Sequence, residues 1–357
     1  MRILVISLAG IGDTLFATPV LAELRSAFAD AQIDVFVVWP GAKDLLEGNP
    51  NVNSIYQHDL IHAPKFQSLH YLRTLRRLRY DLSINVHPQS RVPYRIVARI
   101  IAARRRLSHD YGNSRLVDRF LVTESVPQDY NVHCAENNLN LLELLDRRPK
   151  LSRHEFELYL SEAERKQASD YLSANPVTGK LLLGFHVGSG TTKNLAKRRW
   201  PVENFIALFK RILTEKPTAA ILLFGGPAEQ EAHAAILKES PGQAVFAPAT
   251  KNLREAAAIL QKCHAFVSVD TVFMNLAAAV KVPRQIVIDT PTFNKTVHPY
   301  GNPFSVVENP WVAGRHLEFY RYDGRGIKLS DVDLTRCMAS VSVDSVWIKL
   351  RDALAQS

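Results

Sequence analysis

Short apolar runs alternate with helix-compatible segments along almost the whole chain, and this alternation restricts the possible folds more than any other feature. The runs expected to be strands are Ile3–Ser7, Ile33–Val38, Leu82–Val86, Leu181–His186, Ala220–Phe224, Ala265–Val269 and Gln285–Ile288. The segments expected to be helices are Leu15–Ala29, Lys65–Arg79, Val202–Glu215, Leu253–Cys263 and Thr271–Val280. Strands separated by helices form parallel sheets with right-handed crossovers, so the expected class is α/β.

The length of the chain, 357 residues, predicts two domains, because a single core stops growing near roughly 250–300 residues. A polar stretch, SEAERKQASDYLSANP, precedes a new buried strand, so the boundary is expected within residues 161–180. We expect Rossmann-like domains over residues 1–170 and 171–330, and a closing helix over 331–357 that packs back on the first domain by analogy with similar folds. Ligands of parallel sheets bind beyond the carboxyl ends of strands, which predicts chemistry between the domains.

Composition predicts a globular protein of the cytoplasm. The hydrophobic content of 46% and the charged content of 22% are ordinary for soluble proteins. No apolar run approaches the ~20 residues of a membrane span, and the first residues lack the pattern of a signal peptide. The three cysteines are widely separated, which indicates reduced thiols and no metal site or disulfide.

Positive charge is concentrated in residues 70–120, which contain twelve arginines and three acidic residues. This window carries as much net charge as the whole chain, +9. It is either a solvated helical face or a surface for an anionic partner, such as a phosphorylated acceptor or lipid headgroups. Nucleic acid is not expected, because no stacking aromatic residues alternate with the arginines.

The first informative loop is LAGIGDTLFATPVL, residues 8–21, which follows the first expected strand. A dinucleotide-binding loop has the pattern G-x-G-x-x-G, whereas here Gly10 and Gly12 are followed by Leu15 at the third position. Asp13 would also repel a pyrophosphate, so NAD binding is disfavoured. Two interpretations of Asp13 stay open: it is the N-cap of a helix, or a general base for an acceptor hydroxyl.

The second loop lies within FHVGSGTTKNLAKRRWPVENF, residues 185–205. Small residues with accessible backbone N–H groups are Gly188, Ser189, Gly190, Thr191 and Thr192. Basic side chains follow before Trp-Pro, at Lys193, Lys197, Arg198 and Arg199. Backbone donors combined with cations suit a diphosphate. A plain surface loop is the alternative.

Two further loops follow expected strands and carry acids. In LLFGGPAEQE, Gly226 is followed by Glu229 and Glu231, which either complement a helix dipole or accept hydrogen bonds from a ribose diol. In FVSVDTVFMNLAAAVKVP, Asp270 and Thr271 end a strand. Asp270 is either the N-cap of the next helix or a ligand of sugar hydroxyls.

Together the four loops resemble glycosyltransferase family 9, the ADP-heptose:lipopolysaccharide heptosyltransferases. The matching segments are GIGDTLFATPVL, AKRRWP, LLFGGPAEQE and VSVDTVFMNLAAAVKVP, in this order over roughly residues 1–300. The resemblance implies a GT-B fold, in which two Rossmann-like domains with parallel sheets face a central cleft. The second domain would hold mainly the donor and the first the acceptor. It also implies an inverting, metal-independent transfer without a cofactor, from a nucleotide-sugar co-substrate, ADP-heptose.

The resemblance also assigns roles by position. Asp13 becomes the base that deprotonates the acceptor hydroxyl. Lys197 and Arg198 are alternatives for the cation that neutralises the diphosphate leaving group, because Arg198 occupies the family's usual lysine position. The expected donor-binding residues are Gly188, Ser189, Gly190, Thr191, Thr192, Gly226, Glu229, Glu231, Asp270, Thr271, Val272 and Asn275.

The implied acceptor is an anionic or lipid-linked saccharide such as the lipopolysaccharide core. The enzyme would therefore work in the cytoplasm, in peripheral contact with an anionic membrane through the arginine-rich window.

The chain departs from the family pattern D-T-G-x-x-H at two positions, where Val272 replaces the glycine and Asn275 the histidine. Valine lacks the backbone freedom of glycine, and asparagine cannot carry a proton. Heptose is therefore one candidate sugar among several. A non-catalytic binding relative and a sugar-nucleotide epimerase or hydrolase stay as alternatives. The segment EFYRYDGRGIKLS, residues 318–330, has no assigned role.

Overall fold

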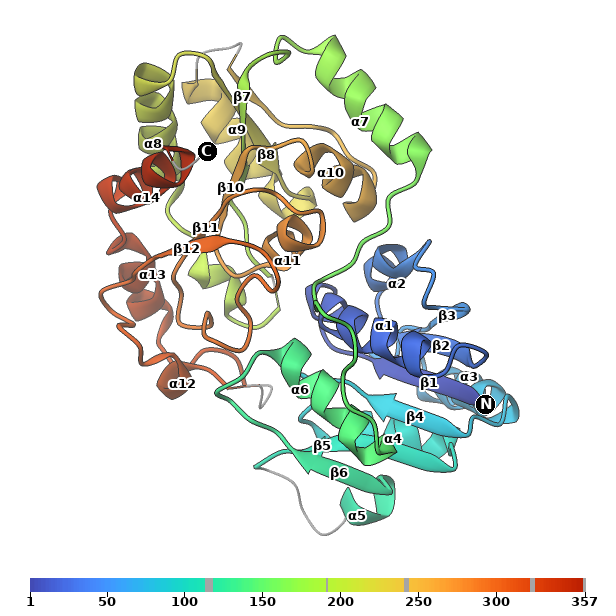
Figure 1. Ribbon diagram of the computed structural model, residues 1–357. Helices are drawn as coiled ribbons and strands as arrows, with labels where there is room; N and C mark the ends of the chain where they lie inside the picture. Colours follow the sequence, from blue (N-terminus) through green and yellow to red (C-terminus); the bar gives the residue numbers. More distant parts are fainter. Residues whose placement is uncertain (113–117, 191, 241–243, 322–324, 356–357) are drawn as a thin grey trace. The chain divides into compact units, whose positions relative to one another are not determined.

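The chain divides into two compact units (Figure 1), seen here in a computed structural model that describes residues 1–112, 118–190, 192–240, 244–321 and 325–355. The first unit covers Met1–Tyr159, and the second begins at Leu160. The expected boundary after residue 170 is thus too late. Helix α7 (Glu162–Ala174) belongs to the second unit, because its Glu164 forms an ion pair of 2.6 Å with Arg254 in α10 (Leu253–Leu260).

The first unit contains a six-stranded parallel sheet with the strand order β3-β2-β1-β4-β5-β6. Ile3 in β1 lies opposite Ile33 in β2 and Leu82 in β4, which sets the register at the centre of the sheet. The strands are β1 (Arg2–Ser7), β2 (Gln32–Val37), β3 (Ser54–Gln57), β4 (Leu82–Asn85), β5 (Arg105–Asp110) and β6 (Glu124–Pro127).

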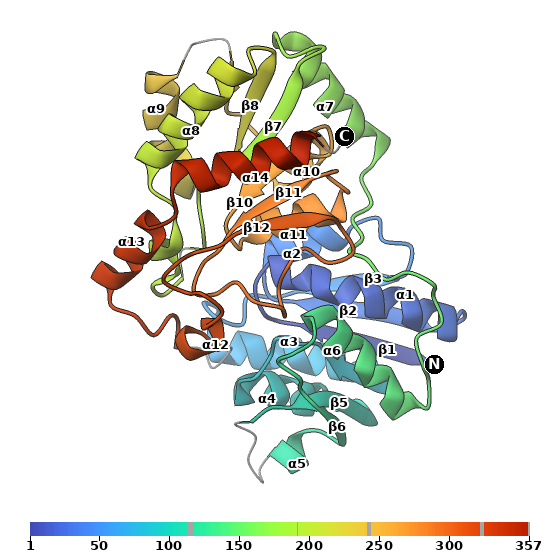
Figure 2. The same cartoon turned by 60° about the vertical axis from the view of Figure 1, so that its left-hand side comes forward.

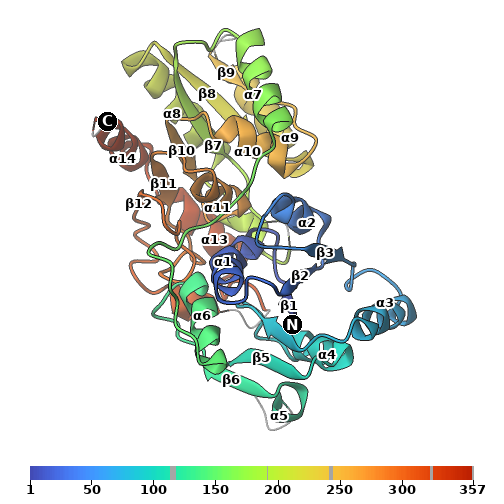
Figure 3. The same cartoon turned by 45° about the vertical axis from the view of Figure 1, so that its right-hand side comes forward.

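Helices cover both faces of this first sheet, because alternate residues of β1 point to opposite faces. Ile3 and Val5 pack in the same core as residues of α1 and α6, whereas Leu4 and Ile6 pack in the same core as residues of α3 and α4. Figure 3 shows α1 and α6 on one side of this sheet and α3 and α4 on the other. The helical elements are η1 (Gly12–Ala17), α1 (Thr18–Ala27), α2 (Pro40–Leu46), α3 (Lys65–Arg77), α4 (Val92–Ile101), α5 (Asp118–Leu121), α6 (Cys134–Asn140) and η2 (Leu141–Leu145).

The second unit contains a six-stranded parallel sheet with the order β12-β11-β10-β7-β8-β9. Its strands are β7 (Leu181–His186), β8 (Ala219–Phe224), β9 (Val245–Phe246), β10 (Ala265–Ser268), β11 (Gln285–Ile288) and β12 (Phe304–Val307). Besides α7 and α10, its helical elements are η3 (Leu195–Arg198), α8 (Val202–Glu215), η4 (Pro227–Glu229), α9 (Gln230–Glu239), α11 (Val272–Ala279), α12 (His316–Phe319), α13 (Asp331–Ala339) and α14 (Val343–Ala355). The two parallel sheets confirm the expected α/β class.

The closing helix α14 packs within the second unit, not on the first as expected. Trp347 and Leu350 of α14 are fully buried in the same core as Phe205 of α8. Figure 2 shows α14 lying across one face of this sheet beside α8. The indole of Trp200 donates a hydrogen bond of 2.9 Å to the Val341 carbonyl just before the helix. The apolar stripe of α14 therefore completes the core of its own unit.

Arginines of the charged window have different environments. Arg95 is buried and forms an ion pair of 2.7 Å with Asp118. Arg105 pairs with Glu124 at 2.7 Å. Exposed arginines lie on the outer face of α3, at Arg73, Arg76 and Arg77, and Arg115 lies outside the described residues. Part of the predicted positive charge is therefore structural, and part is available to solvent.

Candidate active site

Most of the predicted donor-binding residues lie at one edge of the second sheet. The strands β8, β7, β10 and β11 are neighbours in this sheet and run parallel. Their carboxyl ends therefore meet at one edge, where ligands of parallel sheets bind. The glycine-rich loop follows β7, Gly226 follows β8, Asp270 follows β10, and Thr292 follows β11.

Arg198 forms the centre of this cluster. Its Nη1 donates hydrogen bonds to Asp270 Oδ2 at 3.0 Å and to Thr292 Oγ1 at 2.6 Å. The hydroxyl of Thr290 lies 2.9 Å from that of Thr292 and extends the network. Because Asp270 pairs with Arg198, the opposite charge compensates a guanidinium whose side chain is only 9% exposed.

One donor of this buried guanidinium is left over. The Nε atom of Arg198 is buried and has no hydrogen-bond partner among the described residues. A buried N–H group without a partner is destabilising, and an anionic oxygen is the strongest acceptor that could satisfy it. An anion at the carboxyl edge of the sheet would satisfy this donor.

Lys197, the alternative cation, has a different partner. Its Nζ lies 3.6 Å from Asp331 Oδ2 at the start of α13, and its side chain is half exposed. Both cations belong to the 3₁₀-helix η3, in which successive side chains point about 120° apart. Of these two cations, Arg198 is thus the one that forms an ion pair with Asp270.

A second ion pair lies beside the glycine-rich loop. Arg199 Nη2 donates to Glu229 Oε1 at 3.0 Å, and Glu229 Oε2 accepts a hydrogen bond of 2.9 Å from the Gly226 backbone N–H. Glu229 is buried, whereas Glu231 is exposed in the first turn of α9. Of the two predicted ribose ligands, Glu229 is thus the one that belongs to the cluster.

Gly188 makes room for the Glu229 carboxylate. A Cβ atom at Gly188 would lie 2.2 Å from Glu229 Oε1, a distance that non-bonded atoms do not adopt. Elsewhere in the loop, the buried Ser189 donates from its hydroxyl to the Leu195 carbonyl at 3.0 Å. Thr192 is exposed, Gly190 has only ordinary van der Waals distances around it, and the predicted Thr191 lies outside the described residues.

Two of the acids thought to be possible N-caps have other partners. The N-cap of α11 is Thr271, not Asp270, which pairs with Arg198. In the first unit, η1 has Ile11 at its N-cap, and Asp13 Oδ2 accepts a hydrogen bond of 2.8 Å from the Gly10 backbone N–H. The carboxylate of Asp13 thus reaches back to a preceding amide, as the acidic arm of a capping box does.

Gln89 anchors the beginning of the loop that carries Asp13. Its Nε2 donates to the carbonyls of Ile6 and Val86, each at 2.6 Å, and its Oε1 accepts from the Leu8 backbone N–H. Gln89 is buried, so these bonds replace the ladder hydrogen bonds where β1 and β4 separate. Sequence reasoning missed this residue.

His186, also missed, ends β7 next to the donor-binding residues. Its Nδ1 lies 3.1 Å from Thr271 Oγ1, and its ring packs on Phe273 with centroids 4.6 Å apart. Burial, with smaller contributions from nearby positive groups, lowers the pKa of His186 to about 3, so the imidazole is neutral near pH 7. Its place at the carboxyl end of a predicted strand was the signal that could have found it.

The two departures from the family motif are accommodated without backbone strain. Val272 is the first residue of α11 and has no left-handed backbone. Asn275 lies one turn later and is buried. The backbone at position 272 thus does not require glycine.

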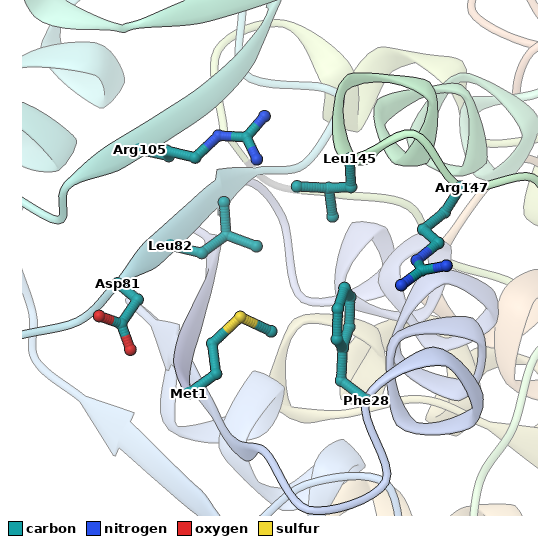
Figure 4. A pocket seen from close by; sticks show the side chains of 7 residues that line it. All are labelled: Met1, Phe28, Asp81, Leu82, Arg105, Leu145 and Arg147. Atoms are coloured by element: carbon teal, nitrogen blue, oxygen red, sulfur yellow. The ribbon is translucent and has the colours of Figure 1, made fainter.

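Three further observations concern metal binding, membrane crossing and a pocket. Among them, no group of three or more His, Cys, Asp and Glu side chains is placed to bind a metal. None of the helices in the described part of the chain has the length and hydrophobicity to cross a membrane. A pocket of about 190 Å³ lies at the edge of the first sheet where its strands begin, and it includes no predicted site residue (Figure 4). The pocket is lined by Met1, Phe28, Asp81, Leu82, Arg105, Leu145 and Arg147.

Comparison with known proteins places these features in a family context. The family model described as glycosyltransferase family 9 (heptosyltransferase) matches residues 69–316. Lipopolysaccharide heptosyltransferase 3 of Escherichia coli is 33% identical over 137 residues, which cover 37% of this chain and 39% of that protein. The match thus spans about two fifths of the length of this curated relative.

Solved structures resemble the whole chain. A family 9 glycosyl transferase from Veillonella parvula superposes with a TM-score of 0.78 at 22% identity, covering 100% of this chain and 97% of that one. The E. coli heptosyltransferase WaaC with ADP-2-deoxy-2-fluoro heptose has a TM-score of 0.72 at 19% identity, with 99% of each chain covered. At such identities the likeness shows the fold, which is the expected GT-B class.

Proposed function

Because this chain belongs to glycosyltransferase family 9, as its four loops predicted, we propose that it transfers a sugar from a nucleotide diphosphate donor to a saccharide acceptor. The first candidate donor is ADP-heptose, and the first candidate acceptor is the lipopolysaccharide core or a similar anionic, lipid-linked saccharide. The proposed reaction inverts the anomeric carbon and uses neither a metal nor a cofactor.

One observation carries the proposal above all others: the buried guanidinium of Arg198 at the carboxyl edge of the second sheet. Its Nε–H lacks a partner among the described residues, and Asp270 fixes its position through Nη1. Negative charge develops on the diphosphate as the bond to the sugar breaks. A preorganised cation lowers the energy of that transition state more than that of the ground state.

The remaining donor contacts are proposed from the same cluster. Glu229 would accept hydrogen bonds from the ribose hydroxyls, since its carboxylate is buried and held by Gly226 and Arg199. Asp270 and Thr271 would contact the donor sugar or phosphate.

Asp13 is proposed as the general base. Its carboxylate would take the proton from the acceptor hydroxyl while the acceptor oxygen forms the new bond to the anomeric carbon. The bond from that carbon to the diphosphate oxygen breaks on the opposite face, and the electron pair leaves with the diphosphate. Arg198 would stabilise the departing charge.

Peripheral membrane contact from the cytoplasmic side is proposed for the outer face of α3. Phe66 is 72% exposed there and Leu69 is 37% exposed. The exposed Arg73, Arg76 and Arg77 lie on the same helix. Apolar side chains combined with arginines favour the interface of an anionic membrane.

The test uses the full chain and has two stages. A thermal-shift screen with ADP-, GDP-, UDP- and dTDP-sugars and with NAD identifies the donor, because a bound ligand raises the melting temperature according to its concentration and affinity. Transfer to a heptose-deficient lipopolysaccharide core is then monitored by measuring the release of ADP and the mass of the product. NMR gives the anomeric configuration of the product.

We expect a shift with ADP-heptose and an acceptor heavier by one heptose, of inverted configuration. Binding without transfer from any tested donor would instead support a non-catalytic relative. Consumption of the donor without an acceptor would support an epimerase or hydrolase, and a shift with NAD alone would overturn the proposal.

A further inference from the structure

The segment of residues 318–330, which had no role in the sequence-based scheme, contacts the glycine-rich loop. The side-chain amide of Asn194 bonds both backbone groups of Ile327: Nδ2 donates to the Ile327 carbonyl at 2.8 Å, and Oδ1 accepts from the Ile327 N–H at 2.9 Å. Ile327 is only 4% exposed. This pair of bonds joins segments that are 133 residues apart in the sequence.

Gly326 permits this close approach. It is buried and has a φ of +84°, a backbone conformation that residues with a Cβ atom rarely adopt. A Cβ atom there would lie 2.6 Å from Asn194 Oδ1. The Lys328 N–H donates to the Phe319 carbonyl at 2.8 Å. The Asn194 side chain therefore packs directly against Gly326 and bonds to the backbone of Ile327.

Asn194 occupies the N-cap position of η3, yet it makes no side-chain capping bond to the described residues of that helix. Asparagine is a favoured N-cap because its oxygen accepts from the first N–H groups of its own helix. Here both its polar atoms bind Ile327 instead. The distant segment is therefore bonded to the residue that begins η3, and Arg198 is the last residue of η3.

We propose that Asn194 and Gly326 are positioning residues that hold η3, and with it Arg198, in the orientation that binds the donor diphosphate. The inference rests on the proposed function, in which Arg198 contacts that group. It makes residues 325–328 a functional part of the donor site, although they need not touch the donor. Asn194 and Gly326 act through Arg198, so their effects must depend on the presence of its guanidinium.

The test measures ADP binding to the full chain by calorimetry. Asn194→Ala is expected to weaken ADP binding about tenfold, as the loss of two hydrogen bonds would allow. Gly326→Ala, which disturbs the same contact from the other side, is expected to act in the same direction. The matched control is Asn252→Ala, which removes an N-cap bond of 2.9 Å to Glu255 in α10. It should lower the melting temperature without changing the ADP affinity.

A double-mutant cycle separates positioning from general destabilisation. In the Arg198→Ala background, Asn194→Ala should cause no further loss of ADP affinity, because residues that act through one group are not additive. An undiminished tenfold loss in that background would overturn the positioning role, as would unchanged affinity in both Asn194→Ala and Gly326→Ala. If Arg198→Ala alone leaves ADP binding unchanged, the proposed role of Arg198 itself fails. Should Asn194→Ala not fold, Gly326→Ala completes the same cycle.

Discussion

The Nη1 atom of Arg198 lies 3.0 Å from Asp270 Oδ2, so the cation assigned to the diphosphate is paired before any donor binds. The pair fixes the guanidinium through Nη1 and leaves its Nε buried without a partner among the described residues. A preorganised cation of this kind does not have to reorient as charge develops during the reaction. The arrangement gives Arg198 and its neighbour Lys197 different expected roles.

Arg198→Ala is expected to lower kcat/KM for transfer by roughly 10²–10³-fold, the usual effect of removing one donor that stabilises developing charge. Lys197→Ala is the matched comparison, since Lys197 forms a solvent-exposed pair with Asp331. Such pairs contribute about 0–1 kcal/mol, so this variant should lose at most a few-fold. Steady-state kinetics with both variants checks the assignment. The reverse ranking would assign the leaving-group role to Lys197.

Asp13→Asn is expected to abolish transfer while donor binding, measured by calorimetry, is retained. The amide keeps an oxygen that can accept from the Gly10 N–H, so the turn closed by that 2.8 Å bond should persist. The amide cannot take up the proton of an acceptor hydroxyl, which removes the base. Full activity in this variant would exclude Asp13 as the base and leave it a structural residue of the turn.

Gly188→Ala is expected to destabilise the fold by about 1–3 kcal/mol, because its new Cβ would overlap the Glu229 carboxylate. Gly190→Ala is the matched control, since a Cβ there would have its nearest neighbour at 3.7 Å, an ordinary contact. Denaturant unfolding of both variants gives the free energies of unfolding. Equal stability of the two variants would show that Glu229 can move aside without loss.

The lowered pKa of His186 predicts that the free energy of unfolding decreases on mild acidification. Burial lowers its pKa from 6.5 in the unfolded chain to about 3 in the folded one. Between these values the unfolded state binds more protons, so stability decreases as the pH falls, by up to about 1.4 kcal/mol per pH unit for this group. His109, whose pKa burial lowers to about 4, acts in the same direction.

Unfolding free energies of the wild type and His186→Gln at pH 7.5 and pH 5.5 check this prediction. The variant should lose less stability between the two pH values than the wild type does, because one buried imidazole no longer needs to stay neutral. An identical loss in both proteins would mean that His186 titrates normally in the folded state.

The inner strands other than β5 could be predicted from the sequence because they form apolar runs that are buried on both faces, whereas β5 (RRLSHD) is polar and exposed at its ends. β7, for example, has the expected bounds, Leu181–His186. The strands not predicted include β3, β6, β9 and β12, which stand at the ends of the two strand orders. Such strands are covered less completely, so the polar segment ESVP of β6 shows no apolar run. The closing helix was predicted, but its packing partner depends on tertiary contacts that no local pattern encodes.

The candidate site was predictable where it follows a buried strand, as with Asp270 and Glu229. Sequence spacing alone could not choose between Lys197 and Arg198, because the direction of each side chain depends on η3. It also gave no weight to Thr292 or Asn194, since their partners are distant in the sequence. Contacts that join remote segments are therefore what the structure adds.

The position of α14 has a consequence for how the protein is made. The first unit is built mainly from Met1–Tyr159, so most of it is synthesised before the second unit. The core of the second unit includes Trp347 and Leu350 of α14, which are synthesised after the described strands of that unit. Until then, the part of this core that α14 covers stays exposed. We therefore expect the second unit to complete its core only after α14 has been synthesised.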